Sequence, residues 1–158
     1  MWVAPKASAE WHYSGEREGS VAIAPHEDPN VKSLVVKVEI SYKGLGDTKL
    51  EYEFPKDLIS LQEIFEAKTQ GWPMWRYHFC RFFLAKLGWP HLNAITWPQQ
   101  FSREDALRQF ALHRVGDLLG ALSLASHDAL PSCVVTSRFA GHEADLGALS
   151  KVSWVDVQ

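Results

Sequence analysis

The chain contains few cysteines and no long apolar run. Its two cysteines, Cys80 and Cys133, can form at most one disulfide bond, whereas small secreted domains held by disulfides use several. The longest apolar run, residues 118–125, includes Gly and Ser and is far shorter than the roughly 20 residues of a membrane-spanning helix. Residues 1–6 lack the basic and then apolar profile of a secretory signal. We therefore expect a cytoplasmic protein with no membrane partner, whose two thiols are free and packed in the core.

The short motifs that mark common catalytic and phosphate-binding sites are also missing. The chain contains no Gly-x-Ser-x-Gly elbow and no His-Glu-x-x-His pair. The glycines of residues 44–46 lack the third glycine and the following Lys-Ser or Lys-Thr of a phosphate-binding loop. Ser126, His127 and Asp128 are the residue types of a hydrolase triad, but consecutive residues cannot reach that geometry, so we expect a turn there.

His113 and Asp117 are the best-placed candidates for chemistry, because they lie four residues apart on one face of a predicted helix. The carboxylate can orient the imidazole at that spacing, which is also the usual spacing of a surface pair. His78 and Cys80 are two residues apart and point to nearly opposite sides of a helix. A metal site would draw on residues whose spacing matches no zinc motif: His127, Asp128, His142, Glu143 and Asp145. From the sequence we assign no catalytic residue, no metal and no cofactor, and we favour a protein that is not an enzyme.

Length and composition predict one globular domain over residues 1–158. A chain of this length buries roughly 70% of the surface that its unfolded form exposes, which is sufficient for a core without disulfides. Hydrophobic residues make up 46% of the chain and charged residues 22%, both typical of globular proteins. The net charge of -3 is unevenly distributed, since residues 67–126 carry seven basic and three acidic side chains. This basic middle third would attract an anionic partner unless its arginines pair with the acidic flanks.

Alternating apolar and polar residues predict an antiparallel hairpin over residues 33–54. The alternation covers residues 34–42 and 50–54, and the Gly-Leu-Gly-Asp turn between them supplies glycines for positive φ. The first 19 residues are rich in turn formers and predict a loose N-terminal segment. Further short strands are expected at residues 21–24, 133–136 and 151–157.

Three helices are expected, near residues 61–69, 73–87 and 103–124. The first begins with a capping box of Ser60 and Glu63, next to a hydrophobic staple of Ile59 and Ile64. The third carries one long apolar face and should be the central packing helix. Together with the hairpin and the C-terminal strands, the helices predict a single-domain α+β fold, in which an antiparallel sheet packs against about three helices.

The most unusual stretch covers residues 71–83, where aromatic rings and arginines are interleaved between turns. Rings with interleaved cations can fill a core or present a contact face, and Trp, Tyr and Arg are the usual anchors of protein interfaces. We therefore interpret the chain as a non-catalytic protein-binding module of the inhibitor, immunity or phage anti-defence kind. The expected contact residues are Trp72, Trp75, Arg76, Tyr77, Arg81, Trp89 and Trp97.

Two other functions are open at this point. A nucleic-acid-binding accessory protein would use the basic middle third, and its cations would have to share one face: Arg76, Arg81, Lys86, Arg103, Arg108 and Arg114. The net negative charge of the chain argues against general affinity for nucleic acids. A small hydrolase would need a composite site of His113, Asp117 or His142, with two of them within about 3 Å in a polar pocket. We rank a protein partner first and leave the oligomeric state open.

Overall fold

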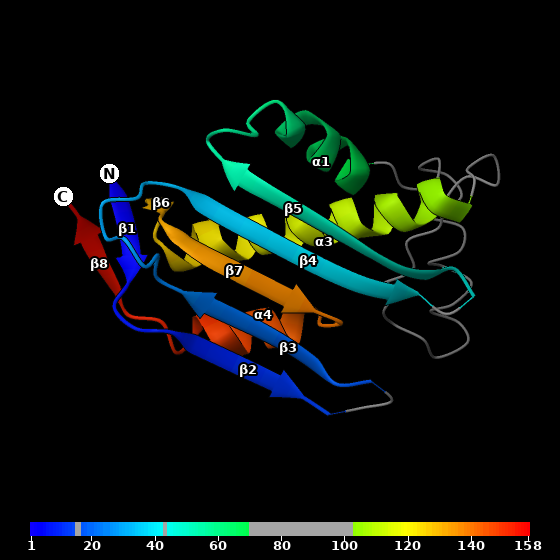
Figure 1. Ribbon diagram of the computed structural model, residues 1–158, viewed down its shortest axis with the longest axis horizontal. Coiled ribbons are helices and arrows are strands. Elements are labelled where there is room, and N and C mark those ends of the chain that lie inside the picture. Colours follow the sequence, from blue (N-terminus) through cyan, green and yellow to red (C-terminus); the bar gives the residue numbers. More distant parts are fainter. Residues whose placement is uncertain (15–16, 43, 70–102) are drawn as a thin grey trace, which may run out of the picture.

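A five-stranded sheet and a three-stranded sheet form the framework of the protein (Figure 1). The computed structural model describes residues 1–14, 17–42, 44–69 and 103–158. In these residues the large sheet has the strand order β2-β3-β7-β4-β5, and the small sheet has the order β6-β1-β8. The strands of the large sheet are β2 (Ala9–Tyr13), β3 (Gly19–Ala24), β4 (Leu34–Tyr42), β5 (Gly46–Phe54) and β7 (Cys133–Arg138). Those of the small sheet are β1 (Trp2–Pro5), β6 (Leu130–Pro131) and β8 (Trp154–Val157).

The predicted hairpin is confirmed as β4 and β5. The two strands pair antiparallel from Leu34 opposite Phe54 to Tyr42 opposite Gly46. Gly44 and Gly46 have φ angles of 85° and 109°, a conformation that glycine adopts at no steric cost. This register places the alternating apolar residues of both strands on one face of the hairpin, where they can pack against helices, as the alternating pattern predicts.

The centre of the large sheet contains one pair of strands that the sequence pattern did not predict. Strand β7 pairs with β4 in parallel and with β3 antiparallel, so the sheet is mixed although largely antiparallel. Parallel neighbours need a long crossover, and here the chain between β4 and β7 includes helix α3 (Arg103–Ala125). The short apolar run predicted at residues 133–136 is thus a buried central strand.

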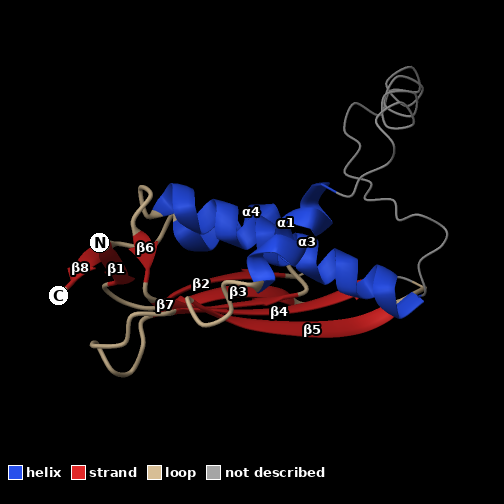
Figure 2. Cartoon of the chain, turned by 90° about the horizontal axis from the view of Figure 1, so that it is seen from above, coloured by secondary structure: helices blue, strands red, loops and turns tan. Residues whose placement is uncertain are grey.

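The helices lie on one face of the large sheet (Figure 2). Helix α3 contacts β4 and β5, helix α4 (His142–Leu149) contacts β2 and β3, and helix α1 (Ser60–Thr69) packs on α3. Between the two layers lie the largest fully buried side chains of the described residues, which include Ile23, Val36, Ile64, Leu112, Leu118 and Val135. The α+β fold class predicted from the sequence is confirmed.

Two local predictions differ from the structure. The side chain of Ile59 is 90% exposed, so it does not form the hydrophobic staple with the buried Ile64. The carboxylate of Glu63 accepts two hydrogen bonds from Arg108 on α3, each of 3.0 Å, in place of the expected capping box with Ser60. Contacts between helices thus replace the contacts predicted within α1, because Arg108 of the neighbouring helix α3 binds the Glu63 carboxylate with two hydrogen bonds.

The first 19 residues, for which the sequence predicts a loose segment, contain β1 and β2. Strand β1 pairs with β6 and β8, and strand β2 forms one edge of the large sheet against β3. The last predicted strand is also present as β8, although it belongs to the small sheet rather than to the large one. The predicted helix at residues 73–87 lies outside the described residues.

Candidate functional site

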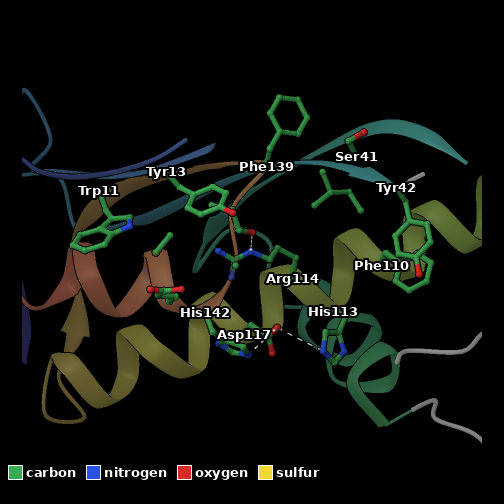
Figure 3. Close-up of a pocket in the computed structure, with 15 residues that line it drawn as sticks. Trp11, Tyr13, Ser41, Tyr42, Phe110, His113, Arg114, Asp117, Phe139 and His142 are labelled. Atoms are coloured by element: carbon green, nitrogen blue, oxygen red, sulfur yellow. Dashed lines mark hydrogen bonds and ion pairs between the residues drawn. The ribbon is translucent and has the colours of Figure 1, made fainter. Parts of the chain in front are cut away.

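A pocket of about 770 Å³ lies between the large sheet and the pair α3 and α4 (Figure 3). We call it the α3–α4 pocket. Its walls combine aromatic rings from β2, β4, α3 and the turn after β7 with polar side chains from the two helices. Its lining residues are Trp11, Tyr13, Ile40, Ser41, Tyr42, Phe110, His113, Arg114, Asp117, Phe139, Ala140, Gly141, His142, Glu143 and Ala144.

Asp117 lies between two imidazoles on the helical side of the pocket. Its Oδ2 atom is 3.5 Å from Nε2 of His113 and 3.3 Å from Nε2 of His142. His113 comes from the preceding turn of α3, and His142 is the first residue of α4, so the carboxylate joins the two helices. The side chain of Asp117 is only 10% exposed, whereas that of His142 is 66% exposed. The nearly buried carboxylate of Asp117 thus orients two imidazoles, the partly exposed one of His113 and the largely exposed one of His142.

Arg114 is buried beside this cluster and is held by acceptors from three directions. Its guanidinium forms a bidentate ion pair with Asp145, which is fully buried on α4. It also donates from Nε to the carbonyl oxygen of Ala140, at 2.8 Å, and from Nη2 to the hydroxyl of Ser137, at 3.1 Å. These bonds tie α3 to the end of β7, to the turn that follows and to α4, and so they fix the positions of the pocket walls.

The turn that leads into α4 gives the pocket its aromatic rim. Phe139 has a φ of 49°, an uncommon value for a residue with a side chain, and its N–H donates to the carbonyl oxygen of Glu39 at 2.9 Å. In Figure 3 its ring points away from Arg114. The guanidinium carbon of Arg17 lies 4.3 Å from the centroid of this ring, a cation–π distance.

The other rings of the pocket are also in contact with neighbours. Tyr42 and Phe110 stack with ring centroids 4.5 Å apart and an interplanar angle of 6°. Nζ of Lys151 lies 5.2 Å from the ring centroid of Trp11. Tyr13, at the end of the edge strand β2, is 56% exposed.

The sequence-based candidates fall into three groups. His113 and Asp117 are paired as their spacing indicated, and the structure adds His142, so all three members of the predicted composite site meet in one pocket. The candidate metal residues do not come together: His127 and Asp128 lie in the turn after α3, while Asp145 is engaged by Arg114. The predicted binding residues lie outside the described residues: Trp72, Trp75, Arg76, Tyr77, Arg81, Trp89 and Trp97.

Two arginines of the basic middle third are described together with their side-chain contacts, and both are paired with acids. Arg108 binds Glu63, a contact that raises the pKa of the guanidinium, and Arg114 binds Asp145. Since Arg114 is buried, the two do not form a common exposed face. Both arginines therefore pair with acidic residues from outside the basic middle third, which is the second of the two interpretations given for the charge of this region.

Within the described residues, no group of three or more His, Cys, Asp or Glu side chains is placed to hold a metal ion. Cys133 is a free thiol buried in β7, and burial raises its pKa to about 12. Such a thiol is a poor nucleophile at neutral pH, because the thiolate is the reactive form. Cys133 therefore acts as a core residue.

Several pocket residues were not found by sequence reasoning. Trp11 and Tyr13 were missed because β2 was not assigned, although Ala9, Trp11 and Tyr13 alternate with Glu10 and His12 in the period of a strand. The pairing of Arg114 with Asp145 joins residues 31 positions apart and has no local signal.

No helix of the described residues is long and apolar enough to cross a membrane. Comparison of the chain with protein-family models, with curated proteins and with solved structures finds no match.

Proposed function

We propose that this protein is a non-catalytic binding module and that the α3–α4 pocket receives its ligand. The observation that supports the proposal is the make-up of the pocket: about 770 Å³, aromatic walls and a few polar side chains that converge from two helices. Small-molecule sites in proteins typically measure about 300 to 1,000 Å³, and they combine apolar walls with a few placed polar groups.

The hydrogen bonds around Arg114 support the interpretation of the α3–α4 pocket as a binding site rather than as a gap left by imperfect packing. They connect α3, β7 and α4 in one buried network, so the walls need little rearrangement when a ligand enters. A pre-organised site loses less conformational entropy on binding, and more of the contact energy then appears as affinity.

The proposal is tested by filling the pocket. Gly141 lines it in an extended conformation, with φ -130° and ψ -166°, and a Cβ atom added there meets nothing within 4 Å. Gly141→Leu should therefore fold normally and occupy part of the cavity. The matched control is Gly120→Leu, because Gly120 is an exposed residue of α3, away from the pocket lining, with the same open space around it.

The measurement is ligand-detected NMR with a panel of single-ring aromatic fragments. We expect fragments that bind the parent protein and Gly120→Leu equally, and that bind Gly141→Leu at least tenfold more weakly. Fragments that bind all three proteins alike would locate the binding elsewhere and contradict the proposal. The same conclusion would follow if no fragment shifted the indole resonance of Trp11.

A second candidate function is acid–base catalysis, which the contact between His142 and Asp117 favours. A general base needs an orienting partner and access to substrate, and His142 has both: Asp117 at 3.3 Å and an open side chain on the pocket wall. Hydrolysis of a panel of activated aryl esters and phosphodiesters tests this alternative. Turnover lost in His142→Ala and retained in His12→Ala, a matched exposed histidine of β2, would favour catalysis over simple binding.

Binding of a protein partner through the aromatic and arginine-rich stretch of residues 71–83 is a separate proposal. It is supported by the composition of that stretch, which lies outside the described residues.

A further inference from the structure

We infer that a second copy of this chain pairs antiparallel with the outer edge of β5, so that two large sheets join across a two-fold axis at Leu50. This interaction surface is separate from the α3–α4 pocket and does not depend on the proposed function. The inference rests on the backbone groups that β5 leaves open and on the pattern of charges along the strand.

The two edges of the large sheet differ in how they are protected. At the β2 edge, Nζ of Lys151 donates to the carbonyl oxygen of Glu10 at 2.9 Å, and the strand is only five residues long. A covering lysine and a short strand are devices by which proteins prevent a further strand from adding. Strand β5 is nine residues long, contains no proline and pairs with β4 without interruption. The described helices lie in a layer on one face of the sheet and not in its plane, so they leave this edge open (Figure 2).

The hydrogen bonds of Glu53 show which backbone groups of β5 point away from β4. Its N–H donates to Oδ2 of Asp57, and its carbonyl oxygen accepts from the N–H of Asp57, both at 2.7 Å. Pairs in an antiparallel ladder alternate between bonded and non-bonded. The N–H and C=O groups of Asp47, Lys49 and Glu51 therefore also point outward, and no strand among the described residues pairs with them there.

The side chains of this edge alternate between a charged and an apolar face. Those of Asp47, Lys49 and Glu51 are exposed, whereas Leu50 packs against the core and Tyr52 is buried. An added strand must therefore bring opposite charges to one face and an apolar side chain to the other, with its own outward backbone groups in step.

A second copy of β5 meets these requirements when Leu50 lies opposite Leu50 of that copy. Lys49 then lies opposite Glu51 of the second copy, and Glu51 lies opposite its Lys49. Each of these two pairs joins outward backbone groups and exchanges both of its N–H···O bonds, while the two leucines meet on the apolar face. The contacts are the same on both copies, as a two-fold axis requires.

This register continues a row of alternating charges that already crosses each sheet. Within one chain Arg138 lies opposite Glu39, with Nε and Oε2 3.1 Å apart, and Glu39 lies opposite Lys49, with Oε1 and Nζ 3.7 Å apart. Lys37 lies opposite Glu51, with Nζ and Oε1 4.0 Å apart. Across the two copies the row is Arg138, Glu39 and Lys49, followed by Glu51 and Lys37 of the second copy. Each charge in the row then has only opposite charges beside it.

The neighbouring registers place like charges opposite each other, which destabilises a sheet. A shift in one direction places Lys49 opposite Lys49 and Asp47 opposite Glu51. A shift in the other direction places Glu51 opposite Glu51 and Lys49 opposite Glu53, whose backbone groups are already bound by Asp57. The register centred on Leu50 is therefore the one that the charges select.

One like pair remains in that register, since Asp47 lies opposite Glu53 of the second copy. Each of these acids has a cation of its own chain beside it, Arg17 at 3.1 Å from Asp47 and Lys56 at 4.0 Å from Glu53. The pair also lies at the end of the interface, beyond the residues that exchange backbone hydrogen bonds. Its repulsion is thus offset in part and does not affect the central pairs.

The test uses two charge reversals in β5. Lys49→Glu and Glu51→Lys each place like charges opposite each other in the dimer, and each should weaken self-association at least tenfold, measured by sedimentation velocity of the full chain from about 10 µM to 1 mM. Glu10→Lys is the matched control, because it reverses an exposed charge on the other edge strand, β2, and should leave self-association unchanged.

A mixture of the two variants provides the sharper result. Position 49 of one variant then faces the opposite charge at position 51 of the other, so the mixture should associate at least tenfold more tightly than either variant alone. General attraction does not account for this result, because each reversal changes the net charge of -3 by two units and both variants stay net negative.

Amide hydrogen exchange of the parent protein locates the interface. Exchange at Lys49 and Glu51 should slow at least tenfold from dilute to concentrated protein, because their N–H groups gain partners only in the dimer. The N–H of Leu50 bonds to β4 in either state and should change less. This measurement needs no variant, so it decides the matter if a reversal impairs folding.

Three results would overturn the inference. A chain that stays monomeric at about 1 mM, with edge amides that exchange freely, would leave the edge to a strand of another protein. Self-association that neither reversal weakens would place the interface elsewhere. Slow exchange of Lys49 and Glu51 in the dilute monomer would show that another segment of the same chain occupies the edge.

Discussion

At the scale of single residues, two glycines in helices have opposite surroundings. A Cβ atom added to Gly147 of α4 would lie 2.5 Å from ring carbons of Trp11, a wall of the pocket, whereas one added to Gly120 of α3 meets nothing within 4 Å. Gly147 is therefore required for the close packing of α4 on β2. Gly120 has no such steric reason to be glycine.

Replacing each glycine by alanine should change stability in opposite directions. We expect Gly120→Ala to raise the free energy of unfolding by up to about 1 kcal/mol, because alanine is the better helix former. Gly147→Ala should lower it by about 1 to 3 kcal/mol, the usual cost of overpacking, since the bulky ring must shift. Urea denaturation of the two variants measures both effects. Equal stabilisation by the two substitutions would show that Trp11 does not pack on α4 in this way.

Cys133 links stability to alkaline pH. Burial raises its pKa from 9.0 to about 12, so the folded state keeps the proton that the unfolded state loses above pH 9.0. A raised pKa of an acid gives stability that is fully present below the unfolded value and is lost as the pH rises toward the folded value. The loss should approach about 1.4 kcal/mol per pH unit between these two values.

The measurement is the free energy of unfolding of the parent protein and of Cys133→Ala, at several pH values from 8 to 11 under reducing conditions. The difference between the two proteins should shrink as the pH rises, because the variant lacks the titrating thiol and shares every other group. Curves that stay parallel over this range would mean that the thiol is not held neutral by burial.

At the scale of elements, the pocket walls depend on one buried ion pair. Arg114 and Asp145 join α3 to α4, and their side chains are 9% and 0% exposed. Arg108 and Glu63 join α3 to α1 in similar bidentate geometry, but they are 45% and 44% exposed. The two pairs thus differ mainly in their access to water.

Removing the acidic residue from each pair should show how burial changes the free-energy cost of losing an ion pair. Asp145→Ala leaves an uncompensated guanidinium in the interior and should cost about 3 to 5 kcal/mol. Glu63→Ala leaves Arg108 in water and should cost about 1 kcal/mol or less. Thermal and urea unfolding measure both changes. A small effect of Asp145→Ala would show that water or another acid reaches Arg114, and the rigid framework assumed for the pocket would then be wrong.

Elements with a regular apolar period could be predicted from the sequence. The hairpin of β4 and β5 and the helix α3 follow their periods of two and about 3.6 residues, which local geometry imposes. The edge strand β2 was missed, because its five residues bury only Ala9 fully and the segment around it is rich in turn formers. The start of α1 was predicted from local capping rules, but Arg108 offered Glu63 a stronger partner than the backbone does.

At the scale of the whole molecule, the candidate site is assembled from distant parts of the chain. Its residues come from β2, β4, α3 and α4, and its two central contacts join Asp117 to His142 and Arg114 to Asp145. The sequence indicates His113, Asp117 and His142 as candidates by their chemistry. It could not place them in one pocket, because the order of the strands and the parallel pair of β4 and β7 depend on packing over the whole chain.

The whole molecule is expected to contact another protein through residues 71–83. The stretch of residues 71–83 gives the reason to expect a second, separate surface, because it combines Trp, Tyr and Arg at a density typical of interface anchors.

The double substitution Trp75→Ala with Arg76→Ala should abolish capture of a partner from a lysate of the source cell. It should change the free energy of unfolding by less than about 1 kcal/mol, as is usual for surface sites. Gly141→Leu is the control, since a partner held by residues 71–83 is still captured when only the pocket is filled. If the double variant unfolds, or loses several kcal/mol, these side chains belong to a core and the interpretation of the stretch as a contact surface is wrong.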